Sequence, residues 1–228
     1  MDLSSGFWQK KWGILIKKES ESLVFTGLEI PRDYITIKEV KHMEKDIESV
    51  RQARSSFNRI LSNSIYADII KDDAHLEILL NLLNGNNYKS ILDIGTGTGY
   101  LAFPLAKIHP TAQVRGIDIA EKVIEQNVER AKEQNYVNLS FHSFDGIEYP
   151  FEKESFDLIV TRYAFHHFPN IKNSIQQMKN LLNSGGKLLI SDPLRHLNDD
   201  NHMIDDFMRI KKMVIFNFIV KQKWMNYL

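Results

Sequence analysis

The residues best suited to binding a ligand lie in the stretch SILDIGTGTGYLAFPLA, Ser90–Ala106. An apolar run reaches Asp93, and then Gly95, Gly97 and Gly99 alternate with other residues before a helical pattern begins. Because glycine has no side chain, such a turn lets a ligand lie directly against the backbone. The helix that follows offers unpaired N–H groups to an electronegative part of the ligand. The sequence therefore predicts a ligand site at the end of a strand.

The spacing of the glycines separates two classes of cofactor. Dinucleotide enzymes use G-x-G-x-x-G, whereas this turn is G-x-G-x-G and has Tyr100 at the position of the third dinucleotide glycine. The carboxylate of Asp93 repels a pyrophosphate and attracts a cationic ligand. A nicotinamide-dependent oxidoreductase is therefore the disfavoured alternative, and a ligand that carries positive charge is favoured.

A second carboxylate follows the next apolar run. The segment VRGIDI reaches Asp118 about 20 residues after the glycine turn, where a carboxylate can accept hydrogen bonds from both hydroxyl groups of a ribose. Dinucleotides share this feature, so it indicates a nucleoside without separating the two classes of cofactor. The alternative is that Asp118 only supplies negative charge at the N-terminus of a helix predicted over Glu121–Asn135.

From about Tyr88 onward, the sequence pattern predicts a scaffold that can position these residues. Short apolar, β-branched runs alternate with amphipathic helical windows, of which Glu121–Asn135 and Asn170–Asn183 are examples. The expected strands are Ser90–Ile94, Gln113–Ile119, Leu139–Phe144, Phe156–Arg162 and Lys187–Ser191. Such alternation implies βαβ crossovers, and the continuous apolar strands imply helices on both faces of the sheet. We therefore predict an α/β fold with a doubly wound, mostly parallel sheet.

The stretch DIGTGTGY, Asp93–Tyr100, resembles the first motif of the class I S-adenosylmethionine-dependent methyltransferases. Four further passages follow in the order of that family: VRGIDI, FHSFDG, FDLIVTRYAFHHFPN and LLNSGGKLLISDP. The resemblance spans residues Tyr66–Asp192 and is nearest to the small-molecule branch, which includes quinone-biosynthesis methyltransferases. It implies a Rossmann-like methyltransferase fold with S-adenosylmethionine as the cofactor.

The same resemblance implies which residues hold the cofactor. The glycine turn would frame the methionine part, Asp118 and Ile119 would contact the ribose and the adenine face, and Asp145 would accept from the adenine amino group. Asp145–Gly146 is also an ordinary turn signal, which leaves a purely structural role open. The end of the strand around Thr161–Tyr163 would approach the methionine part through backbone groups. The full predicted set is Asp93, Gly95, Thr96, Gly97, Gly99, Asp118, Ile119, Asp145, Gly146 and Arg162.

The implied reaction is transfer of a methyl group from S-adenosylmethionine to a small-molecule acceptor, with S-adenosylhomocysteine as the product. The transfer is an in-line SN2 displacement, and much of its catalysis can come from holding the reacting atoms in line in a water-poor pocket. The alternative is a non-catalytic S-adenosylmethionine-binding module, truncated or regulatory, which would bind the cofactor without turnover on any acceptor.

Two adjacent histidines, His166 and His167, are the candidate catalytic residues. A general base is needed only when the acceptor arrives protonated. The pair follows the strand whose end should face the cofactor methyl group, and histidine titrates near neutrality. Adjacent side chains on a strand point to opposite faces, so at most one of the two would reach the acceptor. The alternative is that the pair shapes the pocket or hydrogen-bonds to the backbone.

Composition limits the partners that we expect. Lys and Arg total 29 and Asp and Glu total 29, so the zero formal net charge gives no reason to expect nucleic acid. The chain has no cysteine, which excludes disulfides, thiolate metal sites and a cysteine nucleophile. No metal site is predicted, because the acidic residues of Asp199–Asp206 suit the first turn of a helix. No apolar run is long enough for a membrane span and the N-terminus lacks a signal core, so we expect a cytoplasmic protein.

The two ends of the chain fit the family pattern less well. We expect an N-terminal extension over 1–62, mainly one amphipathic helix at Glu39–Ser62, then a methyltransferase core over 63–212 and an atypical tail over 213–228. The tail, MVIFNFIVKQKWMNYL, is apolar and shorter than the polar helix and antiparallel strand that end the family's domain. Our hypothesis is that a frameshift or truncation replaced those elements, which leaves the edge of the sheet incomplete.

Overall fold

The computed structural model describes residues 18–19, 22–23, 37–61 and 72–192 of the chain. The chain divides into two compact units, Met1–Val40 and Lys41–Leu228. In the first unit, β1 (Lys18–Glu19) and β2 (Ser22–Leu23) form a short antiparallel pair. The second unit contains the main sheet and every predicted site residue.

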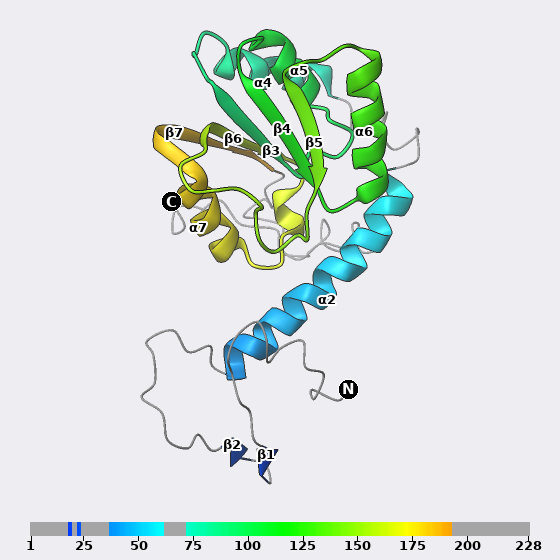
Figure 1. The fold of residues 1–228 in the computed structure, drawn as a ribbon, viewed down its shortest axis with the longest axis vertical. Helices are drawn as coiled ribbons and strands as arrows, with labels where there is room; N and C mark the ends of the chain where they lie inside the picture. The colour runs from blue at the N-terminus through cyan, green and yellow to red at the C-terminus, as the bar shows by residue number, and fades with distance from the viewer. Residues whose placement is uncertain (1–17, 20–21, 24–36, 62–71, 193–228) are drawn as a thin grey trace, which may run out of the picture. The chain divides into compact units, whose positions relative to one another are not determined.

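The second unit is built on a five-stranded parallel sheet (Figure 1). Its strands in chain order are β3 (Ser90–Ile94), β4 (Gln113–Asp118), β5 (Leu139–Ser143), β6 (Phe156–Arg162) and β7 (Leu182–Ser191). Across the sheet the order is β5-β4-β3-β6-β7, so the chain adds strands on one side of β3 and then on the other. Ligands bind such sheets beyond the carboxyl ends of the strands, at the point where the order reverses, which is here between β3 and β6. The predicted doubly wound parallel sheet is confirmed.

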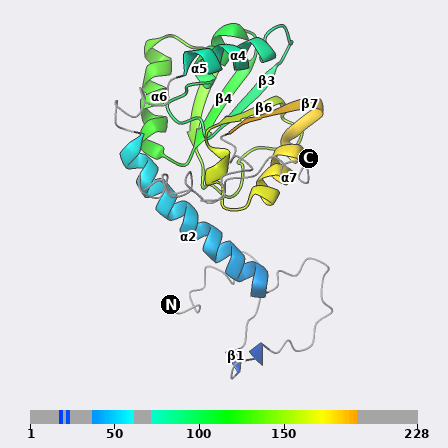
Figure 2. The ribbon, with the colours of Figure 1, turned by 180° about the vertical axis from the view of Figure 1, so that it is seen from behind.

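Alternate residues of the strands pack into two cores, one on each face of the sheet. Leu158 and Ile159 are adjacent in β6 and both fully buried, and they belong to different cores. Leu158 packs with side chains of α4 (Asp73–Leu83), α5 (Ala102–Ile108) and α6 (Glu121–Glu133), whereas Ile159 packs with side chains of α7 (Ile171–Leu181). Figure 2 shows these helices flanking the strands. The result is a three-layer α/β/α arrangement.

Side-chain caps explain where two of the helices begin. The Asp72 Oδ1 accepts from the His75 amide at 3.0 Å, and the Asn170 Oδ1 accepts from the Asn173 amide at 3.1 Å. Each bond satisfies an amide that the first turn of a helix leaves unpaired. The cap of α4 also fixes the backbone of His75, whose side chain contacts the ends of β6 and β7.

The long helix predicted before the core is α2 (Ile37–Ile60), and from Lys41 onward it belongs to the second unit. Val50 and Ala53 are buried, whereas Ile47, one turn earlier, is exposed. The helix therefore packs on the core through its C-terminal half. The predicted helix is confirmed, whereas Met43 and Ile47, two apolar residues of its N-terminal half, are exposed. The predicted boundaries at 62 and 212 stay predictions, and the tail over 213–228, its proposed frameshift and the Asp199–Asp206 group lie outside the described residues.

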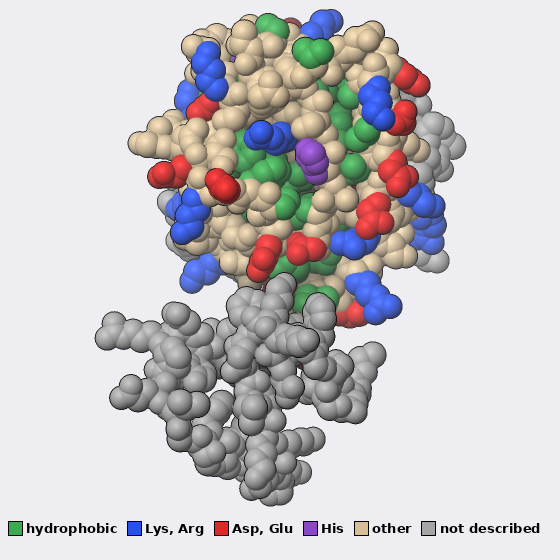
Figure 3. Space-filling model, viewed as in Figure 1, with side chains coloured by type: hydrophobic (Ala, Val, Ile, Leu, Met, Phe, Trp, Pro, Cys, Tyr) green, Lys and Arg blue, Asp and Glu red, His purple; other side chains and the backbone are tan. Residues whose placement is uncertain are grey.

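One face of the described surface carries side chains of both charges. On the face drawn in Figure 3, Lys and Arg side chains are interspersed with Asp and Glu side chains. Within the described ranges, no helix combines the length and the apolarity that a bilayer crossing needs. Nor do three or more His, Cys, Asp or Glu side chains gather into a possible metal site in that part of the chain.

Candidate functional site

The glycine turn follows β3 directly, and all three of its glycines have left-handed backbone conformations. The φ angles of Gly95, Gly97 and Gly99 are +69°, +50° and +73°, a region that residues with a Cβ rarely adopt. A Cβ on Gly95 would also lie 2.3 Å from the Ala164 Cβ, in the segment after β6. The Gly95 amide donates to the Ile117 carbonyl of β4 at 2.9 Å. The turn is therefore held against both strands that neighbour β3.

Asp118, the last residue of β4, lies beside this turn. Its Oδ2 accepts from the Gly97 amide at 2.8 Å, and its Oδ1 accepts from the Ala120 amide at 2.9 Å. Burial raises the pKa of Asp118, an effect that these amide hydrogen bonds oppose. The side chain therefore presents a nearly buried acceptor, fixed in orientation, at the wall of a cavity.

Asp93 supplies a second carboxyl group at the same place. The Thr96 hydroxyl donates to the Asp93 Oδ2 at 2.7 Å. The pKa of Asp93 is raised to about 7, mainly by burial and to a smaller extent by the charge of Asp118, while the Thr96 bond and the Arg162 charge act in the opposite direction. A cation placed beside Asp93 would favour its ionised form.

Two polar residues of α6 hold the glycine turn from behind. Asn127 donates from its Nδ2 to the Gly97 carbonyl at 2.7 Å, and Arg130 donates from its Nη2 to the Thr98 carbonyl. Sequence reasoning missed both residues. The available signal was position, because Asn127 falls four residues before the buried Ala131 on the otherwise apolar face of the helix.

The glycine turn, the ends of β3, β4 and β6, and helix α2 surround one continuous cavity. The space among its lining atoms is about 990 Å³, with its open mouth included. The predicted cofactor residues that line it are Asp93, Gly95, Thr96, Gly97, Asp118, Ile119, Gly146 and Arg162. Gly99 and Asp145 are not among the lining residues. Much of the remaining wall is apolar or aromatic and includes Val50, Ala53, Phe57, Phe144, Tyr149 and Phe168.

Asp145 and Gly146 form a turn after β5. The Asp145 Oδ1 accepts from the amides of Ile147 and Glu148 at 2.8 and 2.9 Å, so this carboxylate caps its own turn. Gly146 has a φ of +85°, and a Cβ there would lie 2.6 Å from the Val50 Cγ1 of α2. Gly146 thus brings α2 close to the cavity, while the contact of Asp145 with an adenine amino group stays a prediction.

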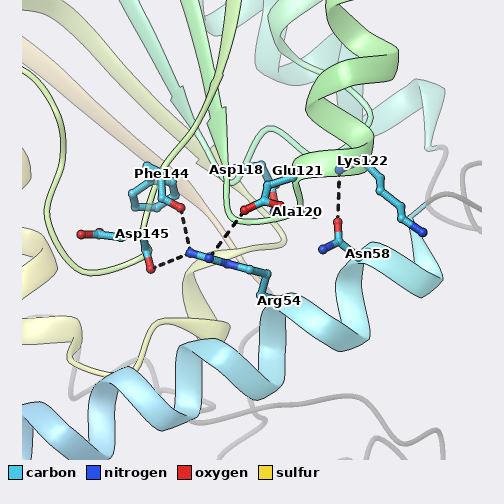
Figure 4. A network of polar contacts seen from close by, with 8 residues as sticks. All are labelled: Arg54, Asn58, Asp118, Ala120, Glu121, Lys122, Phe144 and Asp145. Carbon is cyan, nitrogen blue, oxygen red and sulfur yellow. Dashed lines mark hydrogen bonds and ion pairs between the residues drawn. The ribbon is translucent and has the colours of Figure 1, made fainter.

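Arg54 of α2 attaches the helix to the core (Figure 4). Its Nη2 donates to the carbonyls of Phe144 and Asp145, both at 3.3 Å, and its Nη1 lies 3.6 Å from the Glu121 carboxylate. These contacts join α2 to the segment after β5 and to the start of α6. In the sequence Arg54 interrupts the apolar spacing of the helix, and the structure gives the reason for a cation there. Helix α2 forms one wall of the cavity.

Arg162 ends β6 and lines the cavity between two aromatic rings. Its guanidinium carbon lies 4.3 Å from the centroid of the Tyr100 ring and 4.1 Å from that of the Tyr163 ring. Its Nε donates to the His75 Nδ1 at 3.3 Å, and the His75 Nε2 lies 2.9 Å from the Ser191 Oγ. Sequence reasoning missed His75 and Ser191, because α4 and β7 are far apart in the chain and meet only in the fold.

The prediction that His166 and His167 lie on a strand is wrong. Both residues lie in a short 3-10 helix, η1 (Phe165–His167). The extended run ends because Tyr163 adopts a left-handed conformation with a φ of +53°. His167 lines the cavity. His166 is buried, and its Nδ1 contacts the two carboxylate oxygens of Asp192 at 3.0 and 2.9 Å. Of the two candidates for a base, His167 is therefore the one at the cavity.

Known proteins share both the sequence pattern and the fold. A family model described as a methyltransferase domain matches residues 85–228. The uncharacterized methyltransferase YcgJ of Bacillus subtilis is 28% identical over 118 residues, which are 52% of this chain and 45% of YcgJ. The crystal structure of YcgJ superposes with a TM-score of 0.62 and 22% identity, covering 68% of this chain and 66% of that chain.

Two further relatives have named reactions. The demethylmenaquinone methyltransferase of Porphyromonas gingivalis is 31% identical over 103 residues, 44% of this chain and 42% of the relative. The malonyl-[acyl-carrier protein] O-methyltransferase of Bacillus cereus is 33% identical over 128 residues, 55% of this chain and 46% of the relative. The chain thus spans less than half the length of these curated relatives. Because the family model covers well over half of the chain, the chain belongs to the methyltransferase-domain family, among the class I S-adenosylmethionine-dependent methyltransferases.

Proposed function

We propose that the protein transfers a methyl group from S-adenosylmethionine to a small-molecule acceptor. One observation carries this proposal. The backbone of the glycine turn and the buried carboxyl groups of Asp93 and Asp118 lie side by side in one wall of the cavity. S-adenosylmethionine combines a nucleoside with an ammonium and a sulfonium, and this wall suits each of them. A cofactor with a pyrophosphate would meet two carboxyl groups at the same place.

The adenosine part would lie toward β4 and β5. Asp118 has its oxygens fixed by amides, so a ribose diol can donate to them with little reorganisation of the site. Ile119 and Phe144 offer apolar surface to a flat purine. The Asp145 carboxylate would have to receive the adenine amino group on Oδ2, because Oδ1 already accepts from two amides.

The amino acid part would lie between Asp93 and Arg162. The strands pair with Asp93 opposite Val160, so Arg162 lies two residues further along the neighbouring strand. A carboxyl group and a guanidinium close together complement the ammonium and the carboxylate of an α-amino acid. The side chains present therefore fit the cofactor that the family uses.

Catalysis by this chain would rest mainly on position and on the exclusion of water. S-adenosylmethionine, when bound, would supply an electrophilic methyl group, whose bond to sulfur would break as the bond to the acceptor forms, with S-adenosylhomocysteine as the leaving group. Aromatic side chains such as Phe57 and Phe168 keep the cavity poor in water. His167, which lines the cavity, would take a proton from an acceptor that has one to lose. A small-molecule acceptor is supported by the relative named as a demethylmenaquinone methyltransferase.

Isothermal titration calorimetry with S-adenosylhomocysteine tests the cofactor site. We expect micromolar binding to the wild-type chain and no heat with NADH. Asp118→Ala should weaken binding by about 100-fold, because the ribose would lose a charged acceptor that is fixed in place. Glu125→Ala, which removes an exposed acid of α6, is the matched control and should bind normally. A silent titration with S-adenosylhomocysteine would remove the proposal.

Turnover separates an enzyme from a non-catalytic binding module. The protein is incubated with methyl-labelled S-adenosylmethionine and a panel of quinols, phenols, amines and carboxylic acids, and methylated product is counted. We expect a labelled product that Asp118→Ala abolishes, and that His167→Ala reduces without loss of S-adenosylhomocysteine binding. Binding of the cofactor with no product across the whole panel would favour the binding module instead.

A further inference from the structure

We propose that His75 is a positioning residue, which orients the Arg162 guanidinium toward a carboxylate bound in the cavity. This inference rests on the proposed function, because the carboxylate belongs either to the amino acid part of the cofactor or to the acceptor. His75 lies in the first turn of α4, and Arg162 ends β6. They lie 87 residues apart in the chain, and the contact between them exists only in the fold.

Stacking and hydrogen bonding restrain Arg162 in different ways. The rings of Tyr100 and Tyr163, 4.3 and 4.1 Å from its guanidinium carbon, restrain it through their aromatic faces. An aromatic face offers no directed bond, so stacking alone leaves the group able to turn within its plane. The bond from the Arg162 Nε to the His75 Nδ1, at 3.3 Å, adds a directed contact to this stacking. A guanidinium fixed in this way is preorganised for the two parallel bonds of a carboxylate.

Arg162 selects one tautomer of His75, and Ser191 pairs with the ring nitrogen that remains. The Nδ1 of His75 can accept from Arg162 only if the ring proton is on Nε2. That proton then donates to the Ser191 Oγ at 2.9 Å, at the carboxyl end of β7. The Ser191 carbonyl also accepts from the Tyr163 amide at 2.9 Å. One residue of β7 thus holds both His75 and a ring that stacks on Arg162.

The first turn of α4 is also attached to the glycine turn. The Asp72 amide donates to the Tyr100 hydroxyl at 3.0 Å, and the Asp72 Oδ1 accepts from the His75 amide at 3.0 Å. His75 is therefore held through its backbone and through both ring nitrogens. These bonds set the direction of Arg162 relative to the loop that would hold the cofactor. Arg162 is buried, with 8% of the residue exposed, and a buried cation at a cavity wall favours an anionic group over a neutral one.

Calorimetry with two ligands tests the role of His75 if the carboxylate belongs to the cofactor. S-adenosylhomocysteine has the amino acid part, and 5′-methylthioadenosine lacks it. His75→Asn keeps an acceptor at the place of Nδ1, whereas His75→Gln places its amide near the former Nε2 and removes the acceptor for Arg162. We expect His75→Gln to weaken S-adenosylhomocysteine binding about tenfold and methylthioadenosine binding less than about twofold, with His75→Asn near wild type for both.

Two controls separate this effect from a general loss of structure. His142→Asn changes an exposed histidine of β5 and should leave both affinities unchanged. Retained binding of methylthioadenosine by His75→Gln shows that the variant is folded and that its adenosine site is intact. A merely structural role of His75 would lower both affinities together.

Benzoate, titrated into protein loaded with S-adenosylhomocysteine, tests the other source of the carboxylate. If the carboxylate belongs to the acceptor, His75→Gln should weaken benzoate binding about tenfold and leave both cofactor affinities unchanged. The inference is overturned if His75→Gln changes neither benzoate binding nor the ratio of the two cofactor affinities, or if His75→Asn behaves like His75→Gln. A wild-type chain that binds neither adenosine ligand would overturn the proposed function as well, which makes the two failures distinguishable.

Discussion

At the residue scale, Gly95 is subject to two constraints that can be separated by mutation. Its φ is +69°, and a Cβ there would lie 2.3 Å from the Ala164 Cβ. Gly85, outside the site, has a φ of +78° and nothing within 4 Å of a Cβ. We expect Gly85→Ala to lower the free energy of unfolding by about 1 kcal/mol through backbone strain. Gly95→Ala should lower it by about 3 kcal/mol, because overpacking adds to the strain. Urea denaturation measures both.

A double variant isolates the clash at Gly95. In Gly95→Ala/Ala164→Gly the second change removes the Cβ that the first one meets. The two substitutions should therefore be non-additive, and the double variant should recover part of the stability lost in Gly95→Ala. Strictly additive losses would show that the contact with Ala164 does not decide the path of the turn.

The buried carboxyl group of Asp93 predicts a dependence on pH. Its pKa is about 7 in the folded chain against an ordinary value of 3.8, so the folded state binds this proton more tightly than the unfolded chain does. The contribution of Asp93 to stability is therefore most favourable at low pH, and falls as pH rises toward about 7. Asp93→Asn removes this titration. Both proteins are denatured at a series of pH values from about 4.5 to about 8, which covers most of this titration. The stability of the variant should rise relative to that of the wild type as pH increases.

The same group predicts how ligand binding responds to pH. The ammonium of S-adenosylhomocysteine would favour ionised Asp93, so its affinity should rise up to a pH of about 7 and then level off. Below that pH, binding should release a proton, which calorimetry detects in buffers of different ionisation enthalpy. Asp93→Asn should bind more weakly and lose most of this dependence. An equal pH dependence in the variant would place the ammonium elsewhere.

At the scale of elements, α2 forms a wall of the cavity, and Arg54 bonds it to the segment after β5. Arg54→Ala removes the bonds to the Phe144 and Asp145 carbonyls, and we expect S-adenosylhomocysteine affinity to fall about fivefold as that wall of the cavity loosens. Arg51→Ala, which removes a cation of the same helix that is 82% exposed, should leave the affinity unchanged. Equal effects of the two substitutions would mean that α2 does not support the cofactor site.

Element bounds were largely predictable, because they depend on local patterns. The apolar runs placed β3 and β6 correctly at both ends, and α6 and α7 lie within their predicted windows. The prediction for the segment after β6, that His166 and His167 lie on a strand, was wrong. The residue types of this segment do not signal the end of a strand. The extended run ends at Tyr163, which has a left-handed backbone conformation, and tyrosine is not a residue type that signals a turn.

At the scale of the whole molecule, one sheet joins two cores, so damage to either core should destabilise the same cooperative unit. Leu158→Ala and Ile159→Ala each remove a fully buried side chain of β6, from opposite faces. We expect each to lower the free energy of unfolding by about 2–5 kcal/mol, with a single shared transition. Val137→Ala, at a side chain that is 94% exposed, is the control and should have little effect. Two separate transitions in either core variant would mean that the faces unfold independently.

The sequence by itself determined the order of strands and helices, the position of the glycine turn and the carboxyl groups of Asp93 and Asp118 beside it. These follow from local properties, namely apolar periodicity and the need for glycine where φ is positive. The tertiary structure alone decided that α2 forms a wall of the cavity, that His167 reaches it while His166 is buried, and that His75 contacts Arg162. Each of these depends on contacts between segments far apart in the chain, and such contacts leave no periodic trace in the sequence around the residues that make them.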